Sequence, residues 1–137
     1  MADSLRPAVL RLSRHLRREA QRVGISVTDA QLLGLISKRQ GIGVSGLAEL
    51  ENMSRPSMSA HVKRLEAAGW IRRDPLPGGD QRRMRLILTE QGERSLSAIR
   101  RSRNDWLAGQ IARLPSAERV ALAAAIAALT QLSDVRP

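Results

Sequence analysis

Residues 80–92, which read DQRRMRLILTEQG, are the stretch of the chain that decides the fold. Apolar and basic side chains alternate between residues 83 and 88, which is the period of a β-strand with one buried face. The preceding residues 75–80, PLPGGD, must form a loop, because proline and glycine at this density break a helix. Residues 70–73 are expected to form a second short strand. The segment therefore predicts a two-stranded wing with basic residues beside its loop.

Two short helices are predicted upstream of the wing. Ser45 is expected to cap the first helix, which extends to Leu50, and residues 52–53 make a tight connection. Ser54 is expected to cap the second helix, which carries a proline in its first turn and stops at Gly69. The apolar residues predicted to face inward are Leu47, Ala48 and Leu50 in the first helix and Met58, Val62 and Leu65 in the second. Two consecutive helices followed by a strand pair predict a winged helix-turn-helix.

The second of these helices is the candidate DNA-reading helix. The positions opposite its apolar stripe carry small, hydroxylic and basic side chains, which suit close approach to a groove and bonds to phosphates and base edges. The predicted DNA-binding residues are Ser54, Arg55, Pro56, Ser57, Ser59, Ala60, His61, Lys63 and Arg64 in this helix, and Arg82, Arg83 and Arg85 in the wing. A narrow minor groove attracts an inserted arginine, and Asp80 is expected to support the wing by pairing with Arg82. The competing interpretations are an ordinary solvated helix face and a solvated basic hairpin.

His61 has three open interpretations. Its position on the helix, at about 300° from Met58, puts it at the edge of the buried stripe. It is therefore either a packed edge histidine, a DNA contact or a pH-sensitive contact to a ligand.

Longer helices are predicted on both sides of the winged module. The first carries an apolar stripe and ends near Gly24; its stripe consists of Leu5, Val9, Leu12, Leu16 and Val23. Thr28 begins a capping box that opens the next helix. After the wing, a long helix extends to about Arg113, and an alanine-rich helix follows the break at Pro115. Its alanines allow a second helix to approach closely, and the apolar stripes exceed what a monomer of this size needs to cover its winged module. These features predict a homodimer.

The expected organisation is one domain over residues 1–137. Residues 28–89 form the winged helix-turn-helix lobe, and residues 1–24 and 90–137 form a helical dimerisation region. The fold class is accordingly mainly α, with a small two-stranded β wing.

The composition restricts the partners of the protein. Its 23 Lys and Arg against 13 Asp and Glu give a net charge of +10, which favours nucleic acid or another anionic surface. The near absence of aromatic residues favours duplex DNA over single strands, whose bases stack on aromatic side chains. We expect no metal site or cofactor, because there is no cysteine and the two histidines are far apart in sequence. No apolar stretch is long enough to cross a membrane, which predicts a cytoplasmic protein, and no catalytic constellation is evident.

Residues 80–92 resemble the wing signature of the MarR family of bacterial transcription regulators, which has an Asp-x-Arg, an alternating strand and a Leu-Thr-x-x-Gly. The RPSMS segment at residues 55–59, the LEAAGW segment at 65–70 and the LPSAE segment at 114–118 also resemble the family. The resemblance covers nearly the whole chain.

The resemblance implies a dimer whose two winged lobes each read one half-site of a palindromic operator. It also implies repression that is relieved by a small ligand, often phenolic or anionic, bound between the dimer core and the DNA-binding lobe. An apolar pocket lined by arginine at the junction of the first, second and fifth helices would support this switch. Ala60 departs from the longer base-reading side chain of many members, and the lack of cysteine excludes a thiol-oxidation switch. The alternative is a nonspecific nucleic-acid-binding or architectural winged-helix protein without a ligand switch.

Overall fold

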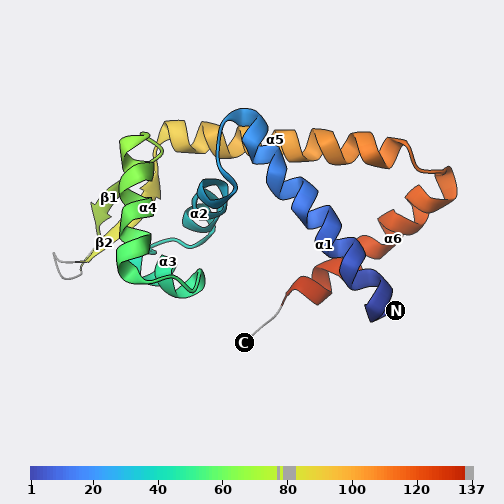
Figure 1. Cartoon of the computed structure of the whole chain (residues 1–137), viewed down its shortest axis with the longest axis horizontal. Helices are drawn as coiled ribbons and strands as arrows, with labels where there is room; N and C mark the ends of the chain where they lie inside the picture. The colour runs from blue at the N-terminus through green and yellow to red at the C-terminus, as the bar shows by residue number, and fades with distance from the viewer. Residues whose placement is uncertain (77, 79–82, 135–137) are drawn as a thin grey trace. The chain divides into compact units, whose positions relative to one another are not determined.

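The computed structural model describes residues 1–76, 78 and 83–134 and is mainly helical with a two-stranded sheet (Figure 1), as predicted. The chain forms two compact units, Met1–Arg103 and Asn104–Pro137. The elements, in chain order, are α1 (Ala2–Arg18), the 3₁₀ helix η1 (Glu19–Val23), α2 (Val27–Lys38), α3 (Val44–Leu50), α4 (Arg55–Ala67), β1 (Ile71–Pro75), β2 (Met84–Leu88), α5 (Glu90–Ala112) and α6 (Ser116–Ser133). No helix of the described residues is both long enough and apolar enough to cross a membrane.

The wing is an antiparallel pair of strands, as the alternating pattern predicts. Ile71 lies opposite Leu88, and Pro75 lies opposite Met84. Pro75 is predicted to lie in the loop, but it is the last residue of β1, where an edge strand tolerates a proline. On its other edge β2 bonds the loop before α3, because the Leu86 N–H donates to the carbonyl of Ile42 at 2.8 Å. The strand is thus held from both sides.

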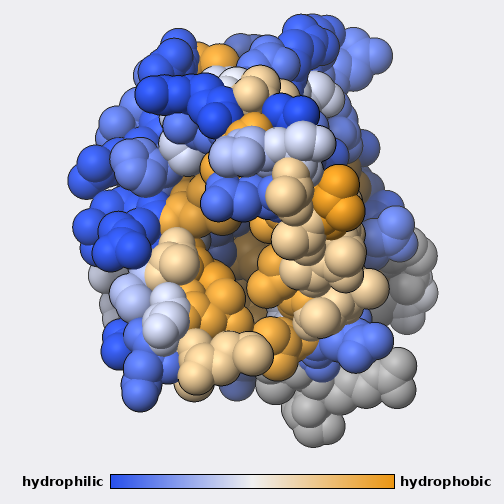
Figure 2. All heavy atoms as spheres, turned by 90° about the vertical axis from the view of Figure 1, so that its right-hand side faces the viewer, coloured by the Kyte–Doolittle hydropathy of each residue, from blue (hydrophilic) through white to orange (hydrophobic). Residues whose placement is uncertain are grey.

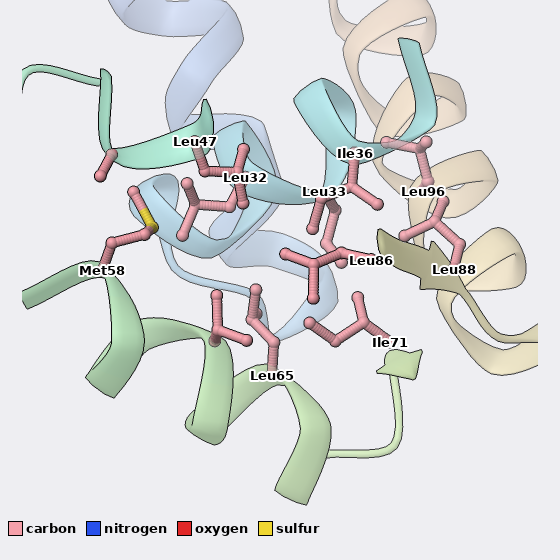
Figure 3. Packing of buried hydrophobic residues seen from close by; sticks show 12 residues of the cluster. Leu32, Leu33, Ile36, Leu47, Met58, Leu65, Ile71, Leu86, Leu88 and Leu96 are labelled. Atoms are coloured by element: carbon pink, nitrogen blue, oxygen red, sulfur yellow. The ribbon is translucent and has the colours of Figure 1, made fainter. Parts of the chain in front are cut away.

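The hydrophobic core of the first unit lies between α2, α3, α4, the sheet and the start of α5. Figure 3 shows side chains from these elements pointing toward one another. The predicted stripe of α4, formed by Met58, Val62 and Leu65, is fully buried, which confirms its inward face. Leu50 was expected to be buried as well, but it is 46% exposed. It is the last residue of the short helix α3, so its side chain lies beyond the contact with α4 and α2.

Two of the three predicted helix caps lie elsewhere. Ser26, not Thr28, caps α2: its Oγ accepts the N–H of Asp29 at 3.1 Å. Gly43, not Ser45, precedes α3 and makes no side-chain cap. The cap at Ser54 is confirmed, because its Oγ accepts the N–H of Ser57 at 3.2 Å. This bond satisfies one of the unpaired donors at the start of α4 and fixes where that helix begins.

Helices in both units carry large hydrophobic side chains that the chain itself leaves uncovered. In α6 no residue is buried, and its exposed apolar residues are Val120, Leu122, Ile126, Leu129 and Leu132. In α1, which belongs to the first unit, Val9, Leu10 and Leu12 are exposed. Figure 2 shows hydrophobic side chains open to solvent.

Candidate nucleic-acid interface

The outer face of α4 is open over its whole length. Among the predicted contact residues of this helix the exposed ones are Ser54, Arg55, Pro56, Ser57, Ala60, Lys63 and Arg64, whereas Ser59 and His61 are half-buried. The face therefore combines short side chains with basic ones and carries no acidic residue between Ser54 and Arg64. A helix with this surface can approach a phosphate backbone or a groove without steric or electrostatic repulsion.

The side chain of Arg64 is exposed, but it already contacts two residues of the protein itself. Its Nη2 atom forms an ion pair with Asp29 of α2 and lies 2.9 Å from Nδ1 of His61. Asp29 is buried, so the pair ties the last turn of α4 to the first turn of α2. Sequence reasoning missed this link because the two residues are 35 positions apart and belong to different periodic patterns.

The tip of the wing, with the predicted contacts Asp80 and Arg82, lies outside the described residues. Beside it, Arg83 is exposed, in keeping with its predicted role. Arg85 is half-buried and its Nη2 donates to Asp74 of β1 at 3.0 Å, while Arg72 pairs with the other oxygen of Asp74 at 3.2 Å. The hydrogen bond from Arg85 and the charge of Arg72 hold the pKa of Asp74 below its usual value. Arg85 thus has a structural partner that the alternating pattern did not reveal.

A basic cleft lies between the wing and the starts of α3 and α4. It has a volume of about 410 Å³, and its lining includes Arg55, Arg73 and Arg83. Arg73 was not among the predicted contacts, and its Nε donates to Glu66 at 2.8 Å, which offsets part of its charge. Arg55 and Arg83 have no acidic partner within the described residues. The cleft is therefore suited to an anionic group such as a backbone phosphate.

The Leu-Thr-x-x-Gly part of the wing signature forms a joint between α4, the wing and α5. The Thr89 hydroxyl donates to the carbonyl of Gly69 at 2.6 Å and accepts the N–H of Gly92 at 3.1 Å. Gly69, just after α4, has a φ of 80°, in the left-handed region that favours glycine. A Cβ at Gly92 would lie 2.0 Å from the Trp70 carbonyl oxygen, so only glycine fits there. The signature thus sets the exit of α4 and the start of α5.

A second pocket lies at the junction of α1, α2 and α5, away from the α4 face. It has a volume of about 310 Å³ and is lined by Val9, Leu12, Ser13, Leu16, Arg17, Gln31 and Arg103. Arg103 donates to the carbonyl of Leu16 at 3.0 Å, which ties α5 to α1. Partial burial, together with the charge of Arg17, lowers the pKa of Arg103. The positive charges of Arg17 and Arg103 repel each other, and an anion bound between them would offset that repulsion. The apolar wall beside them suits an anion that also carries an apolar group.

The described residues contain no group of three or more histidine, cysteine, aspartate or glutamate side chains that could hold a metal ion.

Comparisons with known proteins agree with this reading of the fold. The sequence model of the MarR family matches residues 25–83, from the residue before the cap of α2 to the residue before β2. A helix-turn-helix-type transcriptional regulator of Mycobacterium tuberculosis is 31% identical to the chain, over 100% of the chain and 95% of that protein.

Solved structures show the same architecture. A Pseudomonas aeruginosa protein described as a transcriptional regulator is 36% identical and superimposes with a TM-score of 0.81, covering 98% of this chain and 94% of that one. A variant of MepR from Staphylococcus aureus, solved bound to an oligodeoxyribonucleotide, is 17% identical and has a TM-score of 0.71 over 95% of each chain. At that identity the second structure supports the fold alone.

Proposed function

Because the chain belongs to the MarR family of transcriptional regulators, we propose that it is a homodimeric repressor that binds a palindromic sequence in duplex DNA and is released by a small anionic ligand. The coarser function, DNA-binding regulation of transcription, follows from the family. The observation that carries the finer proposal is the α4 face, which is exposed, hydroxylic and basic, and which adjoins the cleft with Arg55 and Arg83. As a regulator of bacterial DNA, the protein would act in the cytoplasm.

In the proposed complex α4 enters the major groove, and the wing reaches the flanking minor groove through Arg82. Ser54, Arg55 and Arg83 bind backbone phosphates, while the outer residues of α4 face the bases. The proposed base-facing residues are Pro56, Ser57, Ser59, Ala60, His61 and Lys63. Arg64 and Arg85 would have to leave their carboxylate partners to reach DNA, and Asp80 supports Arg82.

The uncovered hydrophobic side chains of α1 and α6 support the dimer. A lone winged helix reads too few base pairs for a unique site, and a two-fold dimer doubles the site. Burying residues such as Leu10 of α1 and Ile126 of α6 against a second copy would remove apolar surface from water. We therefore assign dimerisation to residues 1–24 and 90–137, and DNA binding to residues 28–89.

The pocket at α1, α2 and α5 supports the ligand switch. An anion placed between Arg17 and Arg103 would relieve their repulsion, and the apolar wall formed by Val9, Leu12 and Leu16 would accept a ring. Ligand binding can release DNA only if the ligand prefers a dimer conformation whose α4 helices are wrongly spaced for the operator.

Calorimetric titration with benzoate, an aromatic anion, tests this switch. We expect binding that is lost in Arg103→Leu and kept in the control Arg94→Leu, which removes an exposed arginine from the same helix. Release of DNA by benzoate should show the same dependence on Arg103. Equal binding to both variants would contradict the assigned pocket.

A DNA sequence selection with the purified protein tests the repressor proposal as a whole. We expect enrichment of a palindrome whose half-sites are centred ~34–36 Å apart, about one helical turn. Recovery of unrelated sequences with equal affinity would instead support the nonspecific or architectural alternative, which the net charge of +10 would also allow.

A further inference from the structure

His61 lies on the open side of α4, in a row with two other polar residues. Ser57 precedes it by four positions and Arg64 follows it by three, so the three side chains share one face of the helix. His61 is half-buried, and its Nδ1 atom lies 2.9 Å from Nη2 of Arg64. Among residues 1–76, 78 and 83–134, nothing accepts a hydrogen bond from its other ring nitrogen, Nε2.

The contact with Arg64 determines which nitrogen of the neutral His61 ring carries the proton. A guanidinium can only donate hydrogen bonds, so Nδ1 must be the acceptor and cannot carry a proton. A neutral imidazole has one N–H, which then resides on Nε2. The two ring nitrogens project in divergent directions, so the Nε2–H bond points away from Arg64.

Arg64 is in turn held by the buried carboxylate of Asp29. This ion pair anchors the guanidinium to α2, so its position does not depend on DNA. The chain Asp29–Arg64–His61 therefore presents one fixed hydrogen-bond donor on the helix that faces the groove. A preorganised donor of this kind loses little rotamer freedom on binding.

We propose that His61 is a specificity-determining residue that donates from Nε2 to a base acceptor in the major groove, and that Arg64 is the positioning residue that fixes its tautomer. The inference rests on the proposed function and adds the chemistry of one contact. The major-groove acceptors are the N7 atoms of purines, O6 of guanine and O4 of thymine, whereas cytosine presents an amino donor. One position in each half-site should therefore exclude cytosine on the contacted strand.

The test compares DNA sequence selections with the full-length protein and three variants: His61→Ala, Arg64→Leu and His15→Ala. The last removes the chain's other histidine, on α1, and is the matched control. His61→Ala should lose the base preference at one position of each half-site, keep it elsewhere and bind the best site about tenfold more weakly. Arg64→Leu should weaken the preference at that same position, and His15→Ala should leave every preference unchanged.

Nitrogen-15 NMR of the histidine rings measures which ring nitrogen is protonated. If Arg64 only stabilised the fold, its replacement would leave the tautomer of His61 unchanged. At a pH where both imidazoles are neutral, we expect the His61 ring to be protonated at Nε2, and a mixture of both tautomers in Arg64→Leu. Restoring a donor with Arg64→Lys should recover the Nε2–H form.

The outcomes separate the two proposals. If the wild-type protein selects a palindrome and His61→Ala selects the same one with equal preference at every position, the role of His61 is refuted while the proposed function stands. A protonated Nδ1 in the wild-type ring would refute the positioning role of Arg64, whether or not the variants fold. If the wild-type protein selects no sequence, the proposed function fails and the inference fails with it.

Discussion

Replacing Thr89 by valine should destabilise the protein by about 2 kcal/mol. Valine keeps the shape of threonine but removes the hydroxyl that donates to Gly69 O at 2.6 Å and accepts from Gly92 N at 3.1 Å. Each hydrogen bond contributes about 0.5–1.5 kcal/mol net, so losing both gives about 1–3 kcal/mol. The larger part should come from Gly92, which is buried and whose N–H would then have no partner at the start of α5.

Urea unfolding followed by circular dichroism, at one fixed protein concentration, measures this difference. Thr89→Ser keeps the hydroxyl and should recover most of the lost stability. The control Thr130→Val removes a hydroxyl whose bond, to Ile126 O at 2.9 Å, lies within one exposed helix, so it should change stability by less than about 0.5 kcal/mol. If Thr89→Val changed stability no more than Thr130→Val, Thr89 would not join α4, the wing and α5 as proposed.

Three further predictions concern the DNA-facing side. Arg55→Ala should weaken binding to all sequences alike and reduce the slope of log affinity against log salt by about 1, because it removes one phosphate contact; an unchanged slope in a salt titration would contradict that contact. Arg82→Ala should weaken operator binding about tenfold in a mobility-shift assay at fixed salt, and unchanged affinity would rule out its minor-groove role. The folded pKa of Asp74 is below its usual 3.8, so its ionised form adds stability at neutral pH that is lost as the pH falls through the lower folded value. Wild type should therefore exceed Asp74→Asn in stability at pH 7 by a margin that shrinks below pH 4, and a margin independent of pH in urea unfolding would contradict the ion-pair assignment.

Local patterns were enough to predict the winged module. The alternation of apolar residues in β2 and the helical spacing of Met58, Val62 and Leu65 report directly which side faces the core, because burial of that side stabilises each element. Caps were harder to assign. Ser26 and Thr28 are both hydroxylic residues near the start of α2, and only the backbone conformation decides which of them accepts the N–H of the helix.

Links between distant segments could not be predicted from these patterns. The pairing of Asp29 with Arg64 depends on how α2 packs against α4, and neither residue stands out in its own helix. The family resemblance did point to an arginine-lined pocket at the junction of the first, second and fifth helices, but its lining, with Arg17 and Arg103, could not be named before the three helices were placed. Charge alternation suggested that Arg85 faces outward to DNA, but it could not reveal that Asp74 on the neighbouring strand lies within hydrogen-bond distance of it.

The proposed function depends above all on recognition of a specific palindrome by a dimer. The most direct test is a titration of the selected duplex and of a scrambled duplex of equal length at one salt concentration, with the mass of each complex measured. We predict two protein chains on one duplex and an affinity for the selected sequence at least about 10³-fold higher than for the scrambled one. Equal affinities for the two duplexes, or one chain per selected duplex, would contradict the proposed function.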